Sequence, residues 1–161
     1  MAQREIRVIG DPILRTVCDP VTEITDGVRK TIADLLENVQ QPGRAGLSAN
    51  QIGASIRAFA WNIDGNVGYI INPEIVEISD EDFQDGEEGC LSVPDLWFPC
   101  KRSNYAKAEG IDLDGKKVVI EGTEIWARLI QHEIDHLNGK LYIDRLDRVN
   151  RRKALQATRD L

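Results

Sequence analysis

Two histidines with a glutamate between them are the residues of this sequence best suited to chemistry. His132 and His136 stand four residues apart in the pattern H-E-x-x-H, and the chain has no other histidine. Residues four apart share one face of a helix, so both imidazoles can reach the same metal ion. A lone histidine is more often a packed core residue, but here every histidine stands at ligand spacing. The pattern therefore predicts a metal site on a helix.

Glu133 comes directly after the first histidine, where its carboxylate can approach a water at the metal without binding the metal itself. This placement predicts a general base. The alternative is an exposed helix glutamate, which is disfavoured because Glu133 shares a helix face with Leu129 and Leu137. Asp135 is either solvated or a hydrogen-bond partner of one of the ligands.

Two histidines leave a catalytic metal site one protein ligand short, because such sites commonly have three ligands and an exchangeable water. The acids that follow the second histidine are all aspartates: Asp144, Asp147 and Asp160. Common zinc proteases use a downstream glutamate or histidine, which this chain lacks. A cysteine upstream is the remaining option, and Cys90 follows Gly89, which lets the backbone approach closely. By itself, a single cysteine is more often an inert core residue.

The apolar pattern predicts three helices that would position these side chains. After Thr25, apolar residues recur at helical spacing until Pro42-Gly43. A second helix, with Thr123 as its N-cap, carries both histidines and ends at Gly139. A third, basic helix on the surface extends over about residues 147–161.

Strands are expected in the intervening segments. Residues 56–63 and 69–78 are rich in isoleucine and aromatic residues and predict one hairpin. Residues 105–111 and 117–121 flank an Asp-Gly turn and predict a second. The glycine-containing run 43–53 is typical of a turn. Since helices and strands are segregated, the fold class is α+β, with antiparallel hairpins packed around the central metal-binding helix.

Composition narrows the classes of protein to consider. The 161 residues have 29% charged and 42% hydrophobic members, which predicts one domain over residues 1–161 that folds alone. A net charge of −7 argues against DNA binding. The three cysteines form no C-x-x-C pair, which favours a reducing cytoplasm. No run of 18 apolar residues occurs, so we expect no membrane association.

The C-terminal tail is basic although the chain as a whole is acidic. Its cationic residues are Arg145, Arg148, Arg151, Arg152, Lys153 and Arg159. The favoured interpretation is a solvated helix face, and a weak contact with the ribosome is the alternative.

Three short motifs together resemble those of the peptide deformylases. Two are present without substitution, as Glu-Gly-Cys-Leu-Ser over residues 88–92 and Gln-His-Glu-Ile-Asp-His-Leu-Asn-Gly over residues 131–139. The first motif of that family, G-x-G-L-A-A-x-Q, appears as Arg-Ala-Gly-Leu-Ser-Ala-Asn-Gln over residues 44–51. Arg44 replaces its first glycine and Ser48 replaces an alanine, and neither removes a catalytic group. The similarity extends from Ile9 to Leu146.

The resemblance implies one divalent metal ion, Fe2+ in the family, bound by Cys90, His132 and His136. These ligand types also suit Zn2+, Ni2+ or Co2+. By the same resemblance Glu133 is the acid/base and Gln51 and Leu91 hold the oxyanion. Gly46 and Gly89 would contact the substrate. That substrate would be the formyl-methionyl end of a nascent peptide, from which the enzyme releases formate.

Two other functions fit the same residues. A metalloprotease could use the same helix to cleave internal peptide bonds, although a cysteine as third ligand favours the deformylase. A homologue that binds without turnover is the second alternative. The presence of Gln51, Cys90, Glu133 and both histidines argues against it.

Overall fold

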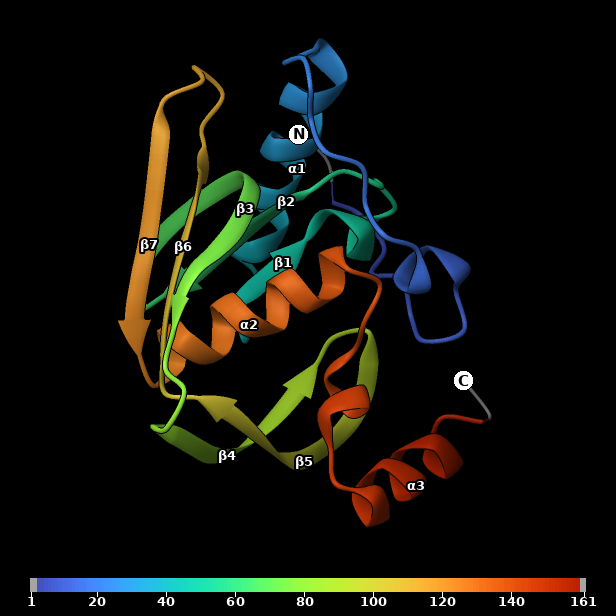
Figure 1. Cartoon of the computed structure of the whole chain (residues 1–161). Coiled ribbons are helices and arrows are strands. Elements are labelled where there is room, and N and C mark those ends of the chain that lie inside the picture. The colour runs from blue at the N-terminus through green and yellow to red at the C-terminus, as the bar shows by residue number, and fades with distance from the viewer. Residues whose placement is uncertain (1–2, 160–161) are drawn as a thin grey trace.

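The computed structural model describes residues 3–159 and has two antiparallel sheets around one central helix (Figure 1). The larger sheet has the strand order β1-β2-β3-β6-β7, and β4 and β5 form a separate two-stranded sheet. The strands are β1 (Gly46–Ser48), β2 (Ala58–Ile63), β3 (Asn66–Ile78), β4 (Phe83–Cys90), β5 (Val93–Ser103), β6 (Tyr105–Ile111) and β7 (Lys117–Thr123). The helices are α1 (Asp26–Val39), α2 (Ile125–Leu137) and α3 (Arg148–Ala157).

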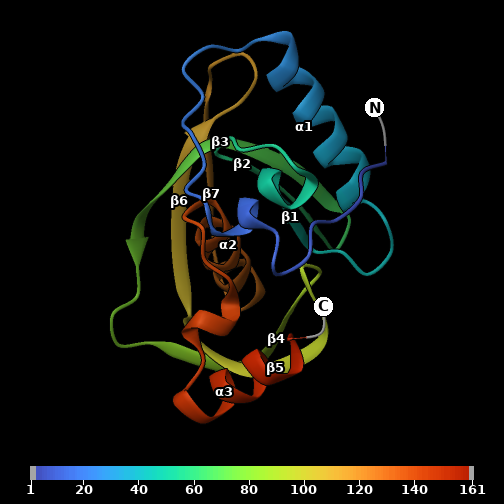
Figure 2. The ribbon, with the colours of Figure 1, turned by 90° about the vertical axis from the view of Figure 1, so that its right-hand side faces the viewer.

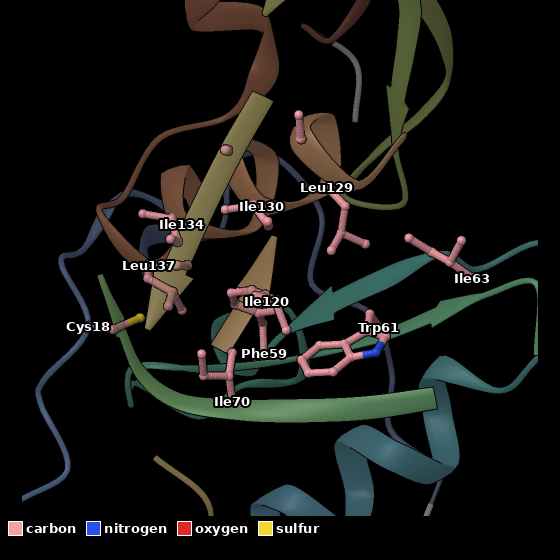
Figure 3. Close-up of a cluster of buried hydrophobic side chains, with 13 residues drawn as sticks. Cys18, Phe59, Trp61, Ile63, Ile70, Ile120, Leu129, Ile130, Ile134 and Leu137 are labelled. Carbon is pink, nitrogen blue, oxygen red and sulfur yellow. The ribbon is translucent and has the colours of Figure 1, made fainter. Parts of the chain in front are cut away.

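The helix α2 lies between the larger sheet and the β4–β5 hairpin, and it contributes to the largest group of buried apolar side chains (Figure 3). Leu129, Ile130, Ile134 and Leu137 of α2 meet side chains of β2, β3 and β7 there. Ile130 and Leu137 are fully buried. Burying such side chains contributes about 1.5–3 kcal/mol each, so the helix that carries the histidines is held firmly against the sheet.

The opposite face of the sheet is covered by α1, as the view of Figure 2 shows. The strand β2 is buried on both faces because α2 covers one face of the sheet and α1 the other, and successive side chains of a strand point to opposite faces. Phe59 and Trp61 point toward α2, whereas Ala58 and Ala60 point toward α1. The N-cap of α1 is Thr25, whose side chain accepts a hydrogen bond from the backbone N–H of Val28.

A third apolar cluster joins the β4–β5 hairpin to the C-terminal segment. Val93 and Cys100 of β5 pack there against Tyr142 and Ile143, which belong to a short 3-10 helix, Tyr142–Arg145. Ala154 of α3 completes the cluster. The segment that follows α2 therefore holds the β4–β5 hairpin in place through this cluster.

The α+β class and the central helix predicted from the sequence are confirmed, as are both expected hairpins, now β2–β3 and β6–β7. Thr123 is not the N-cap of α2, because β7 extends through Thr123. The cap is Glu124, whose backbone has a positive φ of 54°. Gly139, with φ of 74°, follows the helix end as expected.

Three further segments differ from the sequence prediction. The run 43–53 is not a simple turn, since it contains β1 and a 3-10 helix, Ala49–Ile52. The β4–β5 hairpin was not anticipated at all. The third helix is shorter than expected and ends at Ala157, and residues 160–161 of the predicted helix lie outside the described residues.

Within residues 3–159, none of the helices has the length and apolar content needed to cross a membrane.

Candidate active site

The two histidines and the cysteine singled out in the sequence converge on one point. Nε2 of His136 lies 3.2 Å from Nε2 of His132 and 3.3 Å from Sγ of Cys90. Ligand atoms at two corners of a tetrahedral site are about 3.3–3.6 Å apart, given Zn–N and Zn–S bonds of about 2.0–2.3 Å. The three donor atoms thus fit one metal ion of that size, and together they are a group that could hold it.

The three side chains come from two elements that are distant in sequence. His132 and His136 are one turn apart on α2, and Cys90 is the last residue of β4. The pairing of β4 with β5 is irregular between Glu88 and Cys90. Such an irregularity redirects the side chains of a strand. It occurs here where the cysteine meets α2.

Glu88 lies behind this group and orients His132. Its Oε2 is 2.5 Å from Nδ1 of His132, so the other ring nitrogen faces Cys90 and His136. Arg102 donates two hydrogen bonds to the Glu88 carboxylate and Arg128 donates a third. Burial alone would raise the pKa of Glu88, but hydrogen bonds from His132 and Arg102 lower it well below its ordinary value. Glu88 is therefore a carboxylate held in place.

The charged network continues to the C-terminal segment through Asp135. Arg102 donates to Oδ2 of Asp135 at 2.8 Å, and Arg145 binds both of its oxygens. Asp135 is thus buried and paired rather than solvated, and it reaches His132 only through Arg102 and Glu88. Arg145, which was expected to belong to a solvated basic face, instead forms an ion pair with α2.

The electrostatics of the two imidazoles differ. Burial and the neighbouring His132 hold the pKa of His136 well below its ordinary value, so its ring is neutral, the form that binds metals. For His132, burial opposes a positive charge, but hydrogen bonds to Cys90 and Glu88 raise its pKa well above the ordinary value. The Glu88 carboxylate can only accept, so Nδ1 of His132 is the donor in that contact, and Nε2 is the ring nitrogen that faces His136.

Glu133 is 3% exposed and lies beside the three candidate ligands. Burial raises the pKa of its carboxyl group to about 7. Its Oε1 atom is buried and has no hydrogen-bond partner among residues 3–159. A buried carboxylate oxygen without a partner is costly, so this atom is suited to a water or a substrate group.

Gln51 reaches the same group from the 3-10 helix Ala49–Ile52. Its Nε2 lies 3.0 Å from Oγ of Ser92 and 3.7 Å from Sγ of Cys90. Leu91 follows Cys90 directly and is 37% exposed, at the turn between β4 and β5. The sequence-predicted residues Gln51, Leu91, Cys90 and Glu133 thus border a common space.

At both glycines expected in the site, a neighbouring side chain lies too close to leave room for a Cβ atom. A Cβ at Gly46 would lie 2.7 Å from Oε2 of Glu133, and a Cβ at Gly89 would lie 2.7 Å from the ring of Trp97. Any larger residue at position 46 would displace the Glu133 carboxylate.

These residues line one cleft of about 560 Å³. Its walls include Gly46, Gln51, Gly89, Cys90, Leu91, His132 and Glu133. Ile125 and Leu129 of α2 supply apolar surface to it, while Arg44 and Trp97 also contribute to its lining. His136 is 1% exposed and is not part of the lining. The cleft can therefore accept an extended, partly apolar ligand beside the metal-binding group.

Sequence reasoning missed Glu88, Arg102 and Arg128 as members of the site. A signal for Glu88 did exist, because it stands in the same short motif as Cys90, Glu-Gly-Cys-Leu-Ser. The two arginines had no such signal, since only the fold brings β5 and α2 together around Glu88.

Comparisons with known proteins agree with this geometry. A sequence model of the family described as polypeptide deformylase matches residues 3–152. The chain is 48% identical over 160 residues to a peptide deformylase of Acidothermus cellulolyticus, covering 99% of this chain and 88% of the relative. It is 44% identical over 161 residues to one of a Parafrankia species, covering 99% and 87%.

Crystal structures of related enzymes have the same fold. A peptide deformylase from Legionella pneumophila superimposes with a TM-score of 0.88 at 35% identity, over 96% of this chain and 92% of that one. One from Ehrlichia chaffeensis in complex with actinonin gives a TM-score of 0.89 at 31% identity, over 99% and 98%. The chain therefore belongs to the peptide deformylase family of enzymes, hydrolases that remove the formyl group from nascent peptides.

Proposed function

We propose that Cys90, His132 and His136 bind one divalent metal ion, at which formyl-methionyl peptides are hydrolysed to formate and a free methionine N-terminus. The observation that carries this proposal is the convergence of the three donor atoms next to the unpartnered Oε1 of Glu133. A divalent metal in such a site lowers the pKa of a water and polarises a carbonyl group.

Glu133 is the acid/base of the reaction in this proposal. Its carboxylate takes a proton from the attacking water and later gives that proton to the leaving amine nitrogen. Burial supports this role, because it raises the pKa of Glu133 to about 7, near neutral pH, where the same carboxyl group can both accept and donate a proton. Gly46 leaves the space that this carboxylate occupies.

Gln51 and Leu91 stabilise the negative charge that develops on the formyl oxygen. The Gln51 side-chain amide and the Leu91 backbone N–H are the proposed donors. A donor that is already in place in a dry site costs no reorganisation during the reaction, and loss of one typically costs about 100-fold or more in rate. Burial of Gln51, which is 2% exposed, supports such preorganisation.

Ile125 and Leu129 supply an apolar wall suited to the methionine side chain. The part of the substrate that follows its methionine would pass Gly46 and Gly89, where the absence of a side chain allows close contact with the backbone. We assign substrate contact to these two glycines on that basis.

Fe2+ is the proposed metal, following the resemblance, and Zn2+, Ni2+ or Co2+ are also compatible with one thiolate and two imidazoles. We further propose that residues 1–161 act as a single catalytic domain. A cytoplasmic location fits the three cysteines, all of which are free thiols.

The basic face of α3 is a proposed contact with the ribosome. Arg148, Arg151, Arg152 and Arg159 border a shallow groove there, next to Leu155. Such a cluster suits RNA phosphates. Arg151→Gln with Arg152→Gln should weaken co-sedimentation with ribosomes without changing turnover of a free peptide. Equal co-sedimentation of parent and variant would leave the solvated-face interpretation.

Turnover of formyl-Met-Ala-Ser tests the reaction. Protein purified without oxygen should release formate and Met-Ala-Ser, and the unformylated peptide should stay intact. Cleavage of internal peptide bonds at a comparable rate would support a protease instead, and no turnover at all would support a binding protein.

Alanine substitution at each cysteine tests the ligand assignment. Cys90→Ala should fail to hold metal at stoichiometric concentration, because only two ligands remain. Cys100→Ala and Cys18→Ala are matched controls, since both thiols are buried in apolar clusters and neither belongs to the group that could hold the metal. Similar metal loss in all three variants would indicate general destabilisation.

A further inference from the structure

Two fully buried polar residues connect Gln51 to the helix that carries the histidines. Ser48 and Asn50 are both 0% exposed. The Ser48 hydroxyl lies 2.7 Å from Oδ1 of Asn50, and Nδ2 of Asn50 donates to the backbone carbonyl of His136 at 2.7 Å. Buried polar groups are costly unless their hydrogen bonds are complete, so this chain of contacts constrains each member strongly.

Ser48 also fixes which way the Gln51 amide points. The backbone N–H of Ser48 donates to Oε1 of Gln51 at 3.0 Å, and the Ser48 hydroxyl lies 3.1 Å from the same oxygen. A backbone N–H can only donate, so it must face the amide oxygen. The amide nitrogen of Gln51 is thereby directed to Ser92 and Cys90.

Asn50 fixes the distance between that amide and α2. It is the residue immediately before Gln51, in the same 3-10 helix, and its hydrogen bond spans 86 positions in sequence to reach His136. The carbonyl that it binds belongs to the residue whose ring nitrogen lies 3.3 Å from Cys90. The Gln51 residue and the metal-binding helix are therefore connected through Asn50 by one buried hydrogen bond.

We propose that Asn50, held by Ser48, is a positioning residue that sets the distance between the oxyanion donor Gln51 and the metal-binding helix. This inference rests on the proposed role of Gln51. Asn50 does not line the cleft and supplies no candidate ligand atom; it is bonded to Gln51 and holds the backbone of His136, so it acts through the placement of Gln51 relative to α2.

The arrangement is a property of this chain and does not follow from the family pattern. In G-x-G-L-A-A-x-Q, position 50 is variable and position 48 is usually alanine. Here the two positions hold an amide and a hydroxyl that bind each other. An aspartate at position 50 would set a carboxylate against the His136 carbonyl, and an alanine would leave that carbonyl contact empty.

A double-mutant cycle between Asn50 and Gln51 tests the proposal on the metal-loaded full chain. Gln51→Ala should lower kcat for formyl-Met-Ala-Ser by about 100-fold. Asn50→Ala should lower kcat by about tenfold with KM and metal content unchanged, because a misplaced donor loses part of its effect. Added to Gln51→Ala, Asn50→Ala should cost less than about twofold, since no donor is left to position.

The control is Asn38→Ala, which removes an asparagine of equal burial from α1. Its side chain donates to the carbonyl of Asp34 and accepts from the backbone N–H of Arg4, and neither residue lines the cleft, so kcat should stay within about twofold of the parent enzyme. Loss of metal in Asn50→Ala, or equal kcat effects of that substitution with and without Gln51, would overturn the proposal. If Gln51→Ala itself leaves kcat unchanged, the proposed role of Gln51 fails instead, and the inference with it.

Ser48→Ala removes only a hydroxyl group and tests the same proposal if Asn50→Ala does not fold. It should lower kcat by a few-fold, again only when Gln51 is present. In the zinc form, the side-chain amide protons of Gln51 should exchange faster with solvent in Ser48→Ala than in the parent protein, as read from the 1H–15N spectrum. Unchanged exchange together with unchanged kcat would overturn the proposal.

Discussion

Oε2 of Glu88 lies 2.5 Å from Nδ1 of His132, on the side of the ring that faces away from Cys90. This contact fixes the tautomer of His132 and leaves Nε2 free to bind a metal. The Glu88 carboxylate is itself held by Arg102, whose side chain is 4% exposed. The orientation of a candidate ligand thus depends on a buried ion pair, of which Glu88 borders the cleft and Arg102 lies behind it.

Glu88→Gln should weaken metal binding by about 10–100-fold, the usual effect of losing such a supporting carboxylate. It should also lower the free energy of unfolding by about 1.5–3 kcal/mol, because Arg102 and Arg128 lose their hydrogen bonds to a charged carboxylate while Arg102 keeps its ion pair with Asp135. Metal titration and urea unfolding measure the two effects. Glu87→Gln changes the exposed neighbour and should alter neither, and equal results for both variants would contradict the role of Glu88.

Glu133→Ala should retain the metal and lose at least about 100-fold in kcat, the scale of general acid/base catalysis. The carboxylate is not needed as a ligand in the proposed site, so metal content should stay at one ion per chain. Formate release and metal analysis of the same sample check this. An active variant, or one that has lost its metal, would show that the assigned role is wrong.

Gly46→Ala should lower kcat by about tenfold or more while the fold persists. The added methyl group would lie 2.7 Å from Oε2 of Glu133 and 2.9 Å from Cδ1 of Leu129, so the carboxylate must move. Gly27→Ala is the matched control. Its nearest contact would be 3.6 Å away on a helix, and the change should leave kcat unaltered and stabilise the protein by up to about 1 kcal/mol. Comparable kcat values for the two variants would contradict the steric argument.

Activity of the iron form should decay in air, because a thiolate such as Cys90 is the oxidisable form of cysteine and ferrous iron is itself oxidised. The nickel or cobalt form should be active and last longer. The zinc form should bind its metal tightly and turn over slowly. Formate release over time, with and without oxygen, distinguishes these forms. An iron form as durable in air as the nickel form would contradict this prediction.

Segments with a clear apolar pattern were predictable from the sequence because burial of their apolar side chains decides their structure. The apolar spacing around Ile32 and Leu35 specifies α1, and the isoleucine- and aromatic-rich run over residues 56–63 specifies β2. The H-E-x-x-H spacing placed His132 and His136 on one helix face, where the structure has them.

The β4–β5 hairpin was missed because its local signals oppose a strand. The segment Phe83–Cys90 is rich in glycine and acidic residues, and Val93–Ser103 contains Pro94 and Pro99. Its stability comes from packing against Tyr142 and Ile143, which are far away in sequence. The prediction of Thr123 as a helix cap is wrong, because threonine is common both at N-caps, through its hydroxyl group, and in strands, through its β-branched side chain, and here it ends β7.

Cys90 comes from the hairpin, whereas His132 and His136 come from α2, so an ion bound by all three is a cross-link between two layers of the fold. Binding to the folded chain and not to the unfolded one converts metal affinity into folding free energy. Without the ion, the free energy needed to open the β4–β5 hairpin should be lower than that needed to open the five-stranded sheet. We therefore expect limited proteolysis of the metal-free protein to cut this hairpin before the rest of the fold.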